Sequence, residues 1–435
     1  TRDVANVTMD LNDVEAIEFR AIGGADNITI GDLTGTDVQR IDVDLRGPNG
    51  GADQTVDTVT VNATQGGDTF GVTGDTGGVN VFGLAAQVNL FFTDANDRLV
   101  LNGQGGDDVI DASGLEAGAV QLTINGGLGA DRLLGSEGED LITGGDGNDV
   151  AFMGAGNDTF VWNPGDDNDT VEGQAGVDTL LFNGANIGEE INIAANGGRV
   201  TFTRNVAAVV MDNNDVEHIT FNALGGADNI LINDLSGTDV TEVNVNLAGN
   251  GGVGDAAADR VTANATSGDD VIQLAGNASG VAVFGLAAQV NVTGAEAAND
   301  RIVINGLAGD DVIDASGVAA GVIGLTLDGG AGNDIIIGSD GDDIIIGGEG
   351  DDVLIGGLGN DIFDSTIGDD IVIQGFTAGA GTEDRIDLRD FGVNFDWLMA
   401  HASDVNGDVV FDMGDQDITL RGVSLSALHT DDFLT

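Results

Sequence analysis

Glycine and aspartate recur together in a nine-residue pattern in two stretches of the chain. The first stretch, residues 126–161, reads GGLGADRLL, GSEGEDLIT, GGDGNDVAF and MGAGNDTFV. The second stretch, residues 329–364, reads GGAGNDIII, GSDGDDIII, GGEGDDVLI and GGLGNDIFD. All eight units keep Gly at position four and Asp at position six. Looser copies occur at 103–111, 173–181, 306–314 and 365–373.

The first six residues of this unit have the composition of a metal-binding turn. Gly at positions one, two and four permits backbone angles and close approaches that a Cβ atom would block, so carbonyl oxygens can turn inward. Asp at position six adds a carboxylate. Calcium takes six to eight oxygen ligands at about 2.3–2.6 Å, more than one turn supplies. We therefore expect several calcium ions, each held between two stacked turns.

The predicted calcium ligands are the position-six aspartates and the glycines of the best-formed turns. The aspartates are Asp108, Asp131, Asp140, Asp149, Asp158, Asp169, Asp178, Asp311, Asp334, Asp343, Asp352, Asp361 and Asp370. The glycines are Gly126, Gly127, Gly129, Gly144, Gly145, Gly147, Gly329, Gly330, Gly332, Gly347, Gly348 and Gly350.

The last three residues of each unit must place these turns. They predict a short strand whose position-eight side chain points inward, at Leu133, Ile142, Phe160, Ile336, Ile345, Leu354 and Phe363. Two units then complete one turn of a flattened right-handed coil, so turns on one edge are two units apart. The expected neighbours are Asp131 with Asp149, Asp140 with Asp158, Asp334 with Asp352, Asp343 with Asp361, and Asp352 with Asp370.

Some turns depart from the pattern. Met153 replaces a first Gly, and Ser136 and Ser339 replace second Gly residues. These changes leave the carboxylate in place, so we expect them to weaken the geometry of a turn more than its charge. In the looser turns we expect the carboxylate to cap the turn rather than bind an ion, at Asp26, Asp68, Asp228 and Asp270.

These repeats resemble the RTX family, also called hemolysin-type calcium-binding repeat proteins. The resemblance rests on the GGxGxDxUx units quoted above, which cover roughly a quarter of the chain. It implies an all-β fold, a right-handed parallel β-solenoid or β-roll with calcium-binding turns, and secretion by a Gram-negative bacterium through a type I exporter.

A long internal repeat organises the chain. Residues 7–38 match 209–240, and residues 96–118 match 299–321. We predict a first solenoid module at 1–202, a second at 203–364 and a C-terminal region at 365–435. Thr1 aligns with Thr203, inside a module, so we expect either that the chain is a processed fragment or that more modules lie upstream.

The first half of each module alternates apolar and polar residues, as in IDVDL at 41–45 and VDTVTVN at 56–62, which predicts half-buried strands. Short GGxD turns separate these runs. We therefore expect the same parallel coil to continue through 40–100, without an antiparallel sheet.

The tail differs in texture. It predicts a helix near 393–402 and strands at DVVFDM and DITLRG, forming a small cap over the open end of the solenoid. The closing stretch, Asp431 to Leu434, resembles the export signal of type I secreted proteins.

Charge and motifs exclude several functions. The net charge of −61 excludes nucleic acid and anionic membranes as partners, and no apolar run is long enough for membrane insertion. The chain has no Cys, no HExxH and no GxSxG, and its three His show no ligand spacing. We therefore expect no enzyme within this segment.

Two functions remain. The first is a secreted calcium-binding structural protein, a calcium-rigidified rod of an extracellular layer, fibre or adhesin that self-associates at the cell surface. The second is the calcium-dependent folding and export region of a larger secreted enzyme or toxin, with its catalytic domain before Thr1.

Overall fold

The computed structural model describes residues 8–364, 370–381, 384–414 and 416–435. It contains two compact units, one made of residues 1–182 and 209–217 and the other of residues 183–208 and 218–435. These units reflect packing, whereas the modules at 1–202 and 203–364 reflect sequence duplication, so the module boundaries stay a prediction. The expected turn at 365–369 lies outside the described residues.

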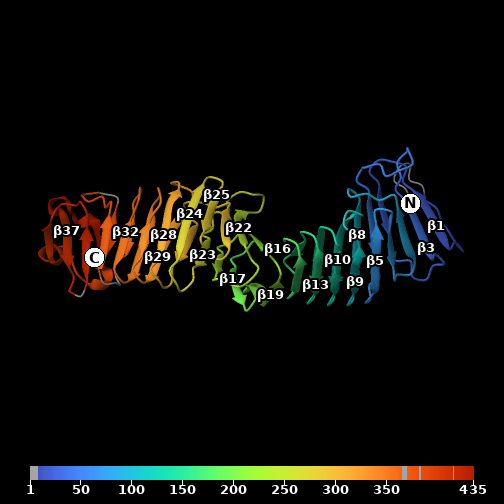
Figure 1. Cartoon of the computed structure of the whole chain (residues 1–435), viewed down its shortest axis with the longest axis horizontal. Helices are drawn as coiled ribbons and strands as arrows, with labels where there is room; N and C mark the ends of the chain where they lie inside the picture. Colours follow the sequence, from blue (N-terminus) through green and yellow to red (C-terminus); the bar gives the residue numbers. More distant parts are fainter. Residues whose placement is uncertain (1–7, 365–369, 382–383, 415) are drawn as a thin grey trace. The chain divides into compact units, whose positions relative to one another are not determined.

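In the first unit the chain alternates between two sheets of mainly parallel strands (Figure 1). In hydrogen-bonding order, one sheet comprises β1 (Ala16–Arg20), β3 (Arg40–Asp44), β7 (Gln87–Phe91), β6 (Gly78–Phe82), β5 (Thr69–Asp75), β9 (Val109–Leu115), β11 (Arg132–Leu134), β13 (Val150–Ala155), β15 (Thr170–Ala175) and β19 (Val209–Asn214). The other comprises β2 (Asn27–Ile30), β4 (Thr58–Asn62), β8 (Arg98–Gly105), β10 (Gln121–Leu128), β12 (Asp140–Asp146), β14 (Thr159–Trp162) and β16 (Thr179–Asn183).

The second unit has the same alternation. One sheet comprises β18 (Arg199–Arg204), β17 (Glu190–Asn196), β21 (Asn229–Ile232), β23 (Arg260–Asn264), β27 (Arg301–Asn305), β29 (Gly324–Ala331), β31 (Asp343–Glu349), β33 (Ile362–Asp364), β35 (Arg385–Asp387) and β39 (Phe433–Leu434). The other comprises β20 (His218–Leu224), β22 (Glu242–Gly249), β26 (Gln289–Thr293), β25 (Gly280–Phe284), β24 (Val271–Asn277), β28 (Val312–Val318), β30 (Ile335–Ile337), β32 (Asp352–Ile355), β34 (Asp370–Gln374), β38 (Asp417–Leu420), β37 (Asp408–Asp412) and β36 (Ala402–Val405).

Both units are therefore parallel β-solenoids, as the sequence predicted. The core lies between the two sheets, where alternate side chains of each short strand are buried. All seven predicted position-eight residues are fully buried, among them Phe160 and Phe363. Each complete turn of the coil forms one rung. The two-residue insertion after Val161 lengthens one rung, so Val150 pairs with Thr170, whereas Arg132 pairs with Val150.

The looser half-modules differ from the expectation at one point in each. The coil continues there, but β5, β6 and β7 run antiparallel to one another, as do β24, β25 and β26. The expectation of parallel strands throughout 40–100 is therefore wrong for 69–91. The physical reason is a two-residue hairpin loop, Thr76–Gly77, which reverses the chain with Gly78 at φ 155°.

The C-terminal region caps both sheets of the second unit. Strand β38 extends one sheet by pairing with β34, and β39 extends the other by pairing with β35. Helix α1 (Phe395–Ala400) lies where a helix was expected, and Phe433 packs against the rings of Phe395 and Phe411. Short 3-10 turns, η2 (Arg389–Phe391), η3 (Leu425–Ala427) and η4 (Thr430–Asp432), connect these elements, and η1 (Val206–Ala208) precedes β19.

Candidate metal centre

Aspartates of stacked turns are joined by a ladder of hydrogen bonds. In the first unit the backbone N–H of Asp131 donates to Asp149 Oδ1 at 2.7 Å, and that of Asp140 donates to Asp158 Oδ1 at 2.8 Å. The second unit repeats this contact from Asp334 to Asp352 at 2.9 Å and from Asp343 to Asp361 at 3.0 Å. The structure therefore brings together four of the five predicted pairs.

The same ladder includes the other buried aspartates that the sequence singled out. The N–H of Asp108 donates to Asp131, that of Asp149 to Asp169, that of Asp158 to Asp178 and that of Asp311 to Asp334. It also includes residues outside the nine-residue pattern, namely Asp57, Asp97, Asp259, Asp300 and Asp384. Rungs of the looser half-modules differ in length, so no fixed spacing marked these five in the sequence.

The fifth predicted pair, Asp352 with Asp370, is wrong. Strand β34 is shifted by one residue, so Asp352 lies opposite Ile371, and exposed Asp370 donates its N–H to Asp351 at 3.2 Å. The shift buries both Ile371 and Ile373, whereas the predicted register would bury Val372 alone. A one-residue slip exchanges the two faces of a strand, and the larger apolar burial decides between them.

Ten buried aspartates of the described residues keep one carboxylate oxygen without a hydrogen-bond partner. In each case Oδ1 takes part in the ladder and Oδ2 accepts nothing from the protein; they are Asp108, Asp131, Asp149, Asp158, Asp169, Asp178, Asp228, Asp311, Asp334 and Asp352. Buried carboxylates are normally paired or bound to a metal, because an unpaired one costs several kcal/mol. The repeated Oδ2 atoms therefore fit a cation.

The glycines of the repeat explain how the turns leave room around these oxygens. A Cβ atom at position one, as on Gly126, would overlap both Asp131 Oδ2 and the carbonyl oxygen of Gly144 in the next turn. Position-one glycines Gly144, Gly329 and Gly347 face the Oδ2 of their own turn in the same way. The glycines at positions two and four have positive φ, and a Cβ atom on any of them would overlap a carbonyl group of the preceding turn. They are Gly127, Gly129, Gly145, Gly147, Gly330, Gly332, Gly348 and Gly350.

Serine at position two donates hydrogen bonds to the aspartate carboxylate of its own turn. The N–H of Ser136 donates to Asp140 Oδ2 at 2.5 Å, and its hydroxyl donates to Oδ1 at 2.8 Å. Ser339 holds Asp343 in the same manner. We expected these serines to affect mainly turn geometry, but they engage the carboxylate itself. Asp140 and Asp343 therefore have hydrogen-bond donors where the Gly-Gly turns have none.

Burial raises the pKa of the ladder carboxyls. Desolvation is the main cause, and neighbouring carboxylates add to it, which raises the pKa of Asp149 to about 7 and that of Asp158 to about 8. The pKa of Asp352 rises to about 6 and that of Asp361 to about 7 for the same main reason. The folded chain thus holds its carboxylates in places that disfavour negative charge unless a cation neutralises them.

The ligand set for such a cation would combine side-chain and main-chain oxygens. Among the described residues, no three His, Cys, Asp or Glu side chains converge on one point. Each turn instead offers one carboxylate beside main-chain carbonyls, as at Gly126, where Asp131 Oδ2 and the Gly144 carbonyl oxygen both lie within 2.6 Å of the place that a Cβ atom would take. Carbonyl and carboxylate oxygens without nitrogen or sulfur are the donor set of a hard cation such as calcium.

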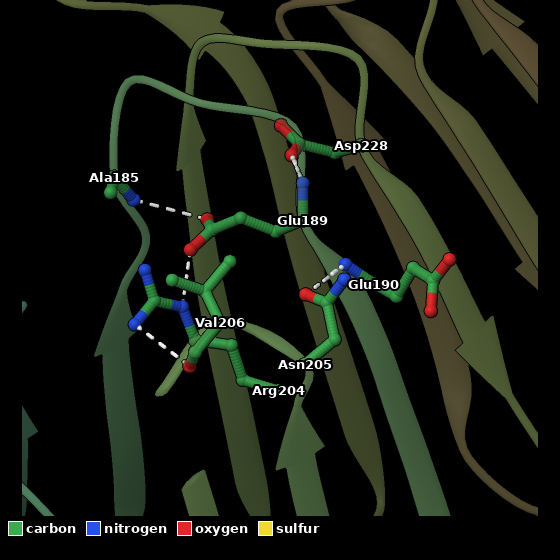
Figure 2. Close-up of polar contacts among 7 residues, drawn as sticks. All are labelled: Ala185, Glu189, Glu190, Arg204, Asn205, Val206 and Asp228. Carbon is green, nitrogen blue, oxygen red and sulfur yellow. Dashed lines mark hydrogen bonds and ion pairs between the residues drawn. The ribbon is translucent and has the colours of Figure 1, made fainter. Parts of the chain in front are cut away.

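One turn of the second unit uses an arginine instead (Figure 2). In the turn 184–189, Glu189 stands at position six, and a Cβ atom on Gly184 would overlap Glu189 Oε2 and lie 3.0 Å from the Ala223 carbonyl oxygen. Oε1 of Glu189 pairs with Nε of Arg204, and Oε2 accepts the N–H of Ala185 at 3.0 Å. Both side chains of the ion pair are buried. No sequence pattern signals this pair, because Arg204 reaches the turn from the hairpin of β17 and β18.

A protein-family model agrees with the repeat pattern. The model of the RTX calcium-binding nonapeptide repeat matches residues 125–160, 165–186, 303–317, 326–354 and 337–372. Curated proteins gave no match. A solved structure, the extracellular lipase LipA from Serratia marcescens, aligns with 19% identity and a TM-score of 0.19 over 76% of this chain and 45% of the lipase chain. The chain therefore carries the calcium-binding nonapeptide repeats of the RTX family.

Proposed function

We propose that this chain is a secreted structural protein that calcium makes rigid. The observation that carries the proposal is the repeated ladder, in which buried aspartates of successive rungs keep one oxygen without a partner. Bound calcium would supply positive charge at these oxygens. The turns would position the carboxylates and carbonyls, and the Asp-to-Asp hydrogen bonds would join each rung to the next.

The chain's own energetics support calcium as the factor that decides folding. Its net charge of −61 opposes compaction, and its aromatic content of 4% gives a thin core. Burial of narrow rungs contributes about 25 cal/mol per Å2, against an ordering cost of about 1–2 kcal/mol per residue. Metal binding then adds directly to the folding free energy, since the turns form a binding site only in the folded chain.

Export before folding follows from the same argument. We propose that the chain stays expanded at low cytosolic calcium, passes through a type I exporter and folds at extracellular calcium concentrations. In the folded cap, Asp432 and Phe433 are buried, and Asp432 accepts N–H groups of Gly379 and His429 at 2.9 and 2.7 Å. An exporter would therefore read this terminal stretch while the cap is unfolded.

Self-association is supported by apolar residues at the first rung of the first unit. Met9 is 70% exposed and Phe19 is 37% exposed, whereas their counterparts in the internal repeat, Met211 and Phe221, are fully buried. Strand β1 pairs with β3, and its other edge has no strand partner among the described residues. Edges of this kind pair with further strands. We propose that a rung of a second copy covers this end.

No catalytic role is proposed for this chain. His401 Nδ1 lies 2.8 Å from the Trp397 carbonyl oxygen, and His429 caps the 3-10 turn η4, so both have structural contacts in the cap. No helix among the described residues is long and apolar enough to cross a membrane.

The test starts with the full chain in chelator and adds calcium in steps. Circular dichroism and the hydrodynamic radius are measured at each step. We expect an expanded coil that becomes β-rich and compact in one cooperative step. A compact, β-rich chain in chelator at about pH 8 would overturn the proposal. Electron microscopy in calcium then separates the two functions, because filaments or layers favour the structural protein and single particles favour the folding region of a larger secreted enzyme or toxin.

A further inference from the structure

Asp228 has the features of a ladder carboxylate, although it lies outside the stretches matched by the RTX repeat model. It is fully buried at the end of the turn 223–228, in the second unit. Its Oδ1 accepts the N–H of Glu189 at 2.7 Å, and its Oδ2 accepts no hydrogen bond (Figure 2). The sequence predicted that the Asp228 carboxylate caps its own turn. A capping carboxylate would accept an N–H of that turn with Oδ2, as Asp140 does from Ser136.

Backbone conformation at one position separates turns with a partnered Oδ2 from turns without one. In all ten turns whose Oδ2 has no partner, the residue four positions before the aspartate has positive φ. These residues are Gln104, Gly127, Gly145, Gly154, Gly165, Gln174, Leu224, Leu307, Gly330 and Gly348.

The matched contrast comes from turns with a hydroxyl residue at that position. The N–H groups of Thr64, Ser136, Thr266 and Ser339 donate to the Oδ2 of Asp68, Asp140, Asp270 and Asp343 at 2.8, 2.5, 2.9 and 2.6 Å. None of the four donors has positive φ. A positive φ thus accompanies loss of the N–H donor that would otherwise satisfy the carboxylate.

Leu224 adopts this conformation at φ 66°. A leucine with positive φ is strained, and such strain persists where the surrounding structure enforces it, often at binding sites. The turn at Asp228 therefore shares the backbone state of the GGxGxD turns without their glycine at position two. Ala223 stands at position one, where those turns have Gly, so we expect weaker affinity here.

Further oxygen donors gather on the same turn. Asp255 Oδ2 accepts the N–H of Gly226 at 2.7 Å. A Cβ atom on Gly225 would lie 2.5 Å from Asn186 Oδ1 and 3.2 Å from Asp255 Oδ2, so these two side chains approach the turn from neighbouring rungs. Glu189, whose N–H donates to Asp228, is already neutralised by Arg204.

We propose that Asp228 is a ligand of a further site for a hard divalent cation, calcium, built from its unpartnered Oδ2, main-chain oxygens of the turn and the side chains of Asn186 and Asp255. This inference rests on the proposed calcium-binding function. It extends calcium binding into the half-module that the nine-residue repeat does not reach.

The test locates and counts calcium in the full chain. Crystals grown in calcium should show an anomalous peak about 2.3–2.6 Å from Asp228 Oδ2. Peaks at Asp131 and Asp149 with none at Asp228 would overturn this inference alone. No peak at any turn would overturn the proposed function as well.

Variants provide the second arm. Asp228→Asn should bind about one calcium fewer than the wild-type chain in equilibrium dialysis. The matched controls are Asp26→Asn, the same residue of the first module, and Asp270→Asn, whose carboxylate is held by Thr266. Both should keep the wild-type count. An unchanged count in folded Asp228→Asn would contradict the site, and if that variant does not fold, the anomalous map of the wild-type chain decides.

Discussion

The buried ion pair between Arg204 and Glu189 occupies the position that an unpartnered carboxylate oxygen occupies in other turns of the solenoid (Figure 2). Arg204 thus brings a permanent positive charge to one rung of the second unit. That rung is complete without calcium, whereas rungs with an unpartnered Oδ2 require a cation to neutralise a buried carboxylate. The buried carboxylate of such a turn can therefore be neutralised in two ways in this chain, by an arginine side chain or by a bound cation.

Replacing Arg204 should destabilise the second unit even when calcium is saturating. Arg204→Met leaves Glu189 buried without its counter-charge, which costs about 3–5 kcal/mol in comparable buried pairs. Urea unfolding in excess calcium measures the loss. Arg389→Ala is the control, because Arg389 is exposed beside Asp387 and such surface pairs contribute about 0–1 kcal/mol. Equal stability of Arg204→Met and the wild-type chain would show that the pair is dispensable.

Asp149 and Asp140 should differ in their effect on calcium-driven folding. Asp149 has an unpartnered Oδ2, whereas Ser136 already holds both oxygens of Asp140. Asp149→Asn removes a ligand charge and should raise the calcium midpoint by about tenfold, since ligand charge sets affinity. Asp140→Asn makes the same charge change and should raise it much less. The titration is followed by circular dichroism, and equal midpoints for the two variants would contradict the distinction.

Position-one glycine is required for a different reason from the other glycines. Gly144→Ala would place Cβ against Asp149 Oδ2, so we expect a loss of about 1–3 kcal/mol in calcium-saturated stability. Gly31→Ala is the matched control, since its Cβ would meet nothing within 4 Å and its φ is not positive. Its effect should stay within about 0.5 kcal/mol. Chemical unfolding of both variants in calcium checks the difference.

The regular part of the molecule could be predicted because its period is fixed. A nine-residue unit determines which residue faces inward and which aspartates become neighbours, as Phe160 and the pair Asp131 and Asp149 show. The antiparallel segments were harder to predict, because Thr-Gly at 76–77 is not among the dipeptides that mark a two-residue hairpin.

The rest depended on contacts that no local pattern encodes. Asp259 and Asp300 join the ladder across 41 residues, in rungs of irregular length. Asp370 does not lie next to Asp352 as expected, because the apolar residues after it set the strand register. The role of Leu224 lies in its backbone angle, and residue type alone does not reveal that a leucine adopts positive φ.

Folding stability should depend on pH with opposite signs in the absence and presence of calcium. In the calcium-free fold, burial raises the pKa of Asp158, Asp169 and Asp228 to about 8, while an unfolded aspartate titrates near 3.9. Between these values the folded chain binds more protons than the unfolded chain, so folding stability is present at low pH and is lost as pH rises through about 8. In chelator, acidification from about pH 8 to about pH 5 should therefore increase β-structure and reduce the hydrodynamic radius.

With limiting calcium the direction reverses, because protons and calcium compete for the same carboxylates. The calcium midpoint should rise as the pH falls over the same interval. Asp158→Asn should flatten the pH dependence in chelator, whereas Asp10→Asn, an equal charge change at an exposed position, should leave it unchanged. If both variants respond alike, the pH effect comes from the overall charge of −61 and not from the buried ladder.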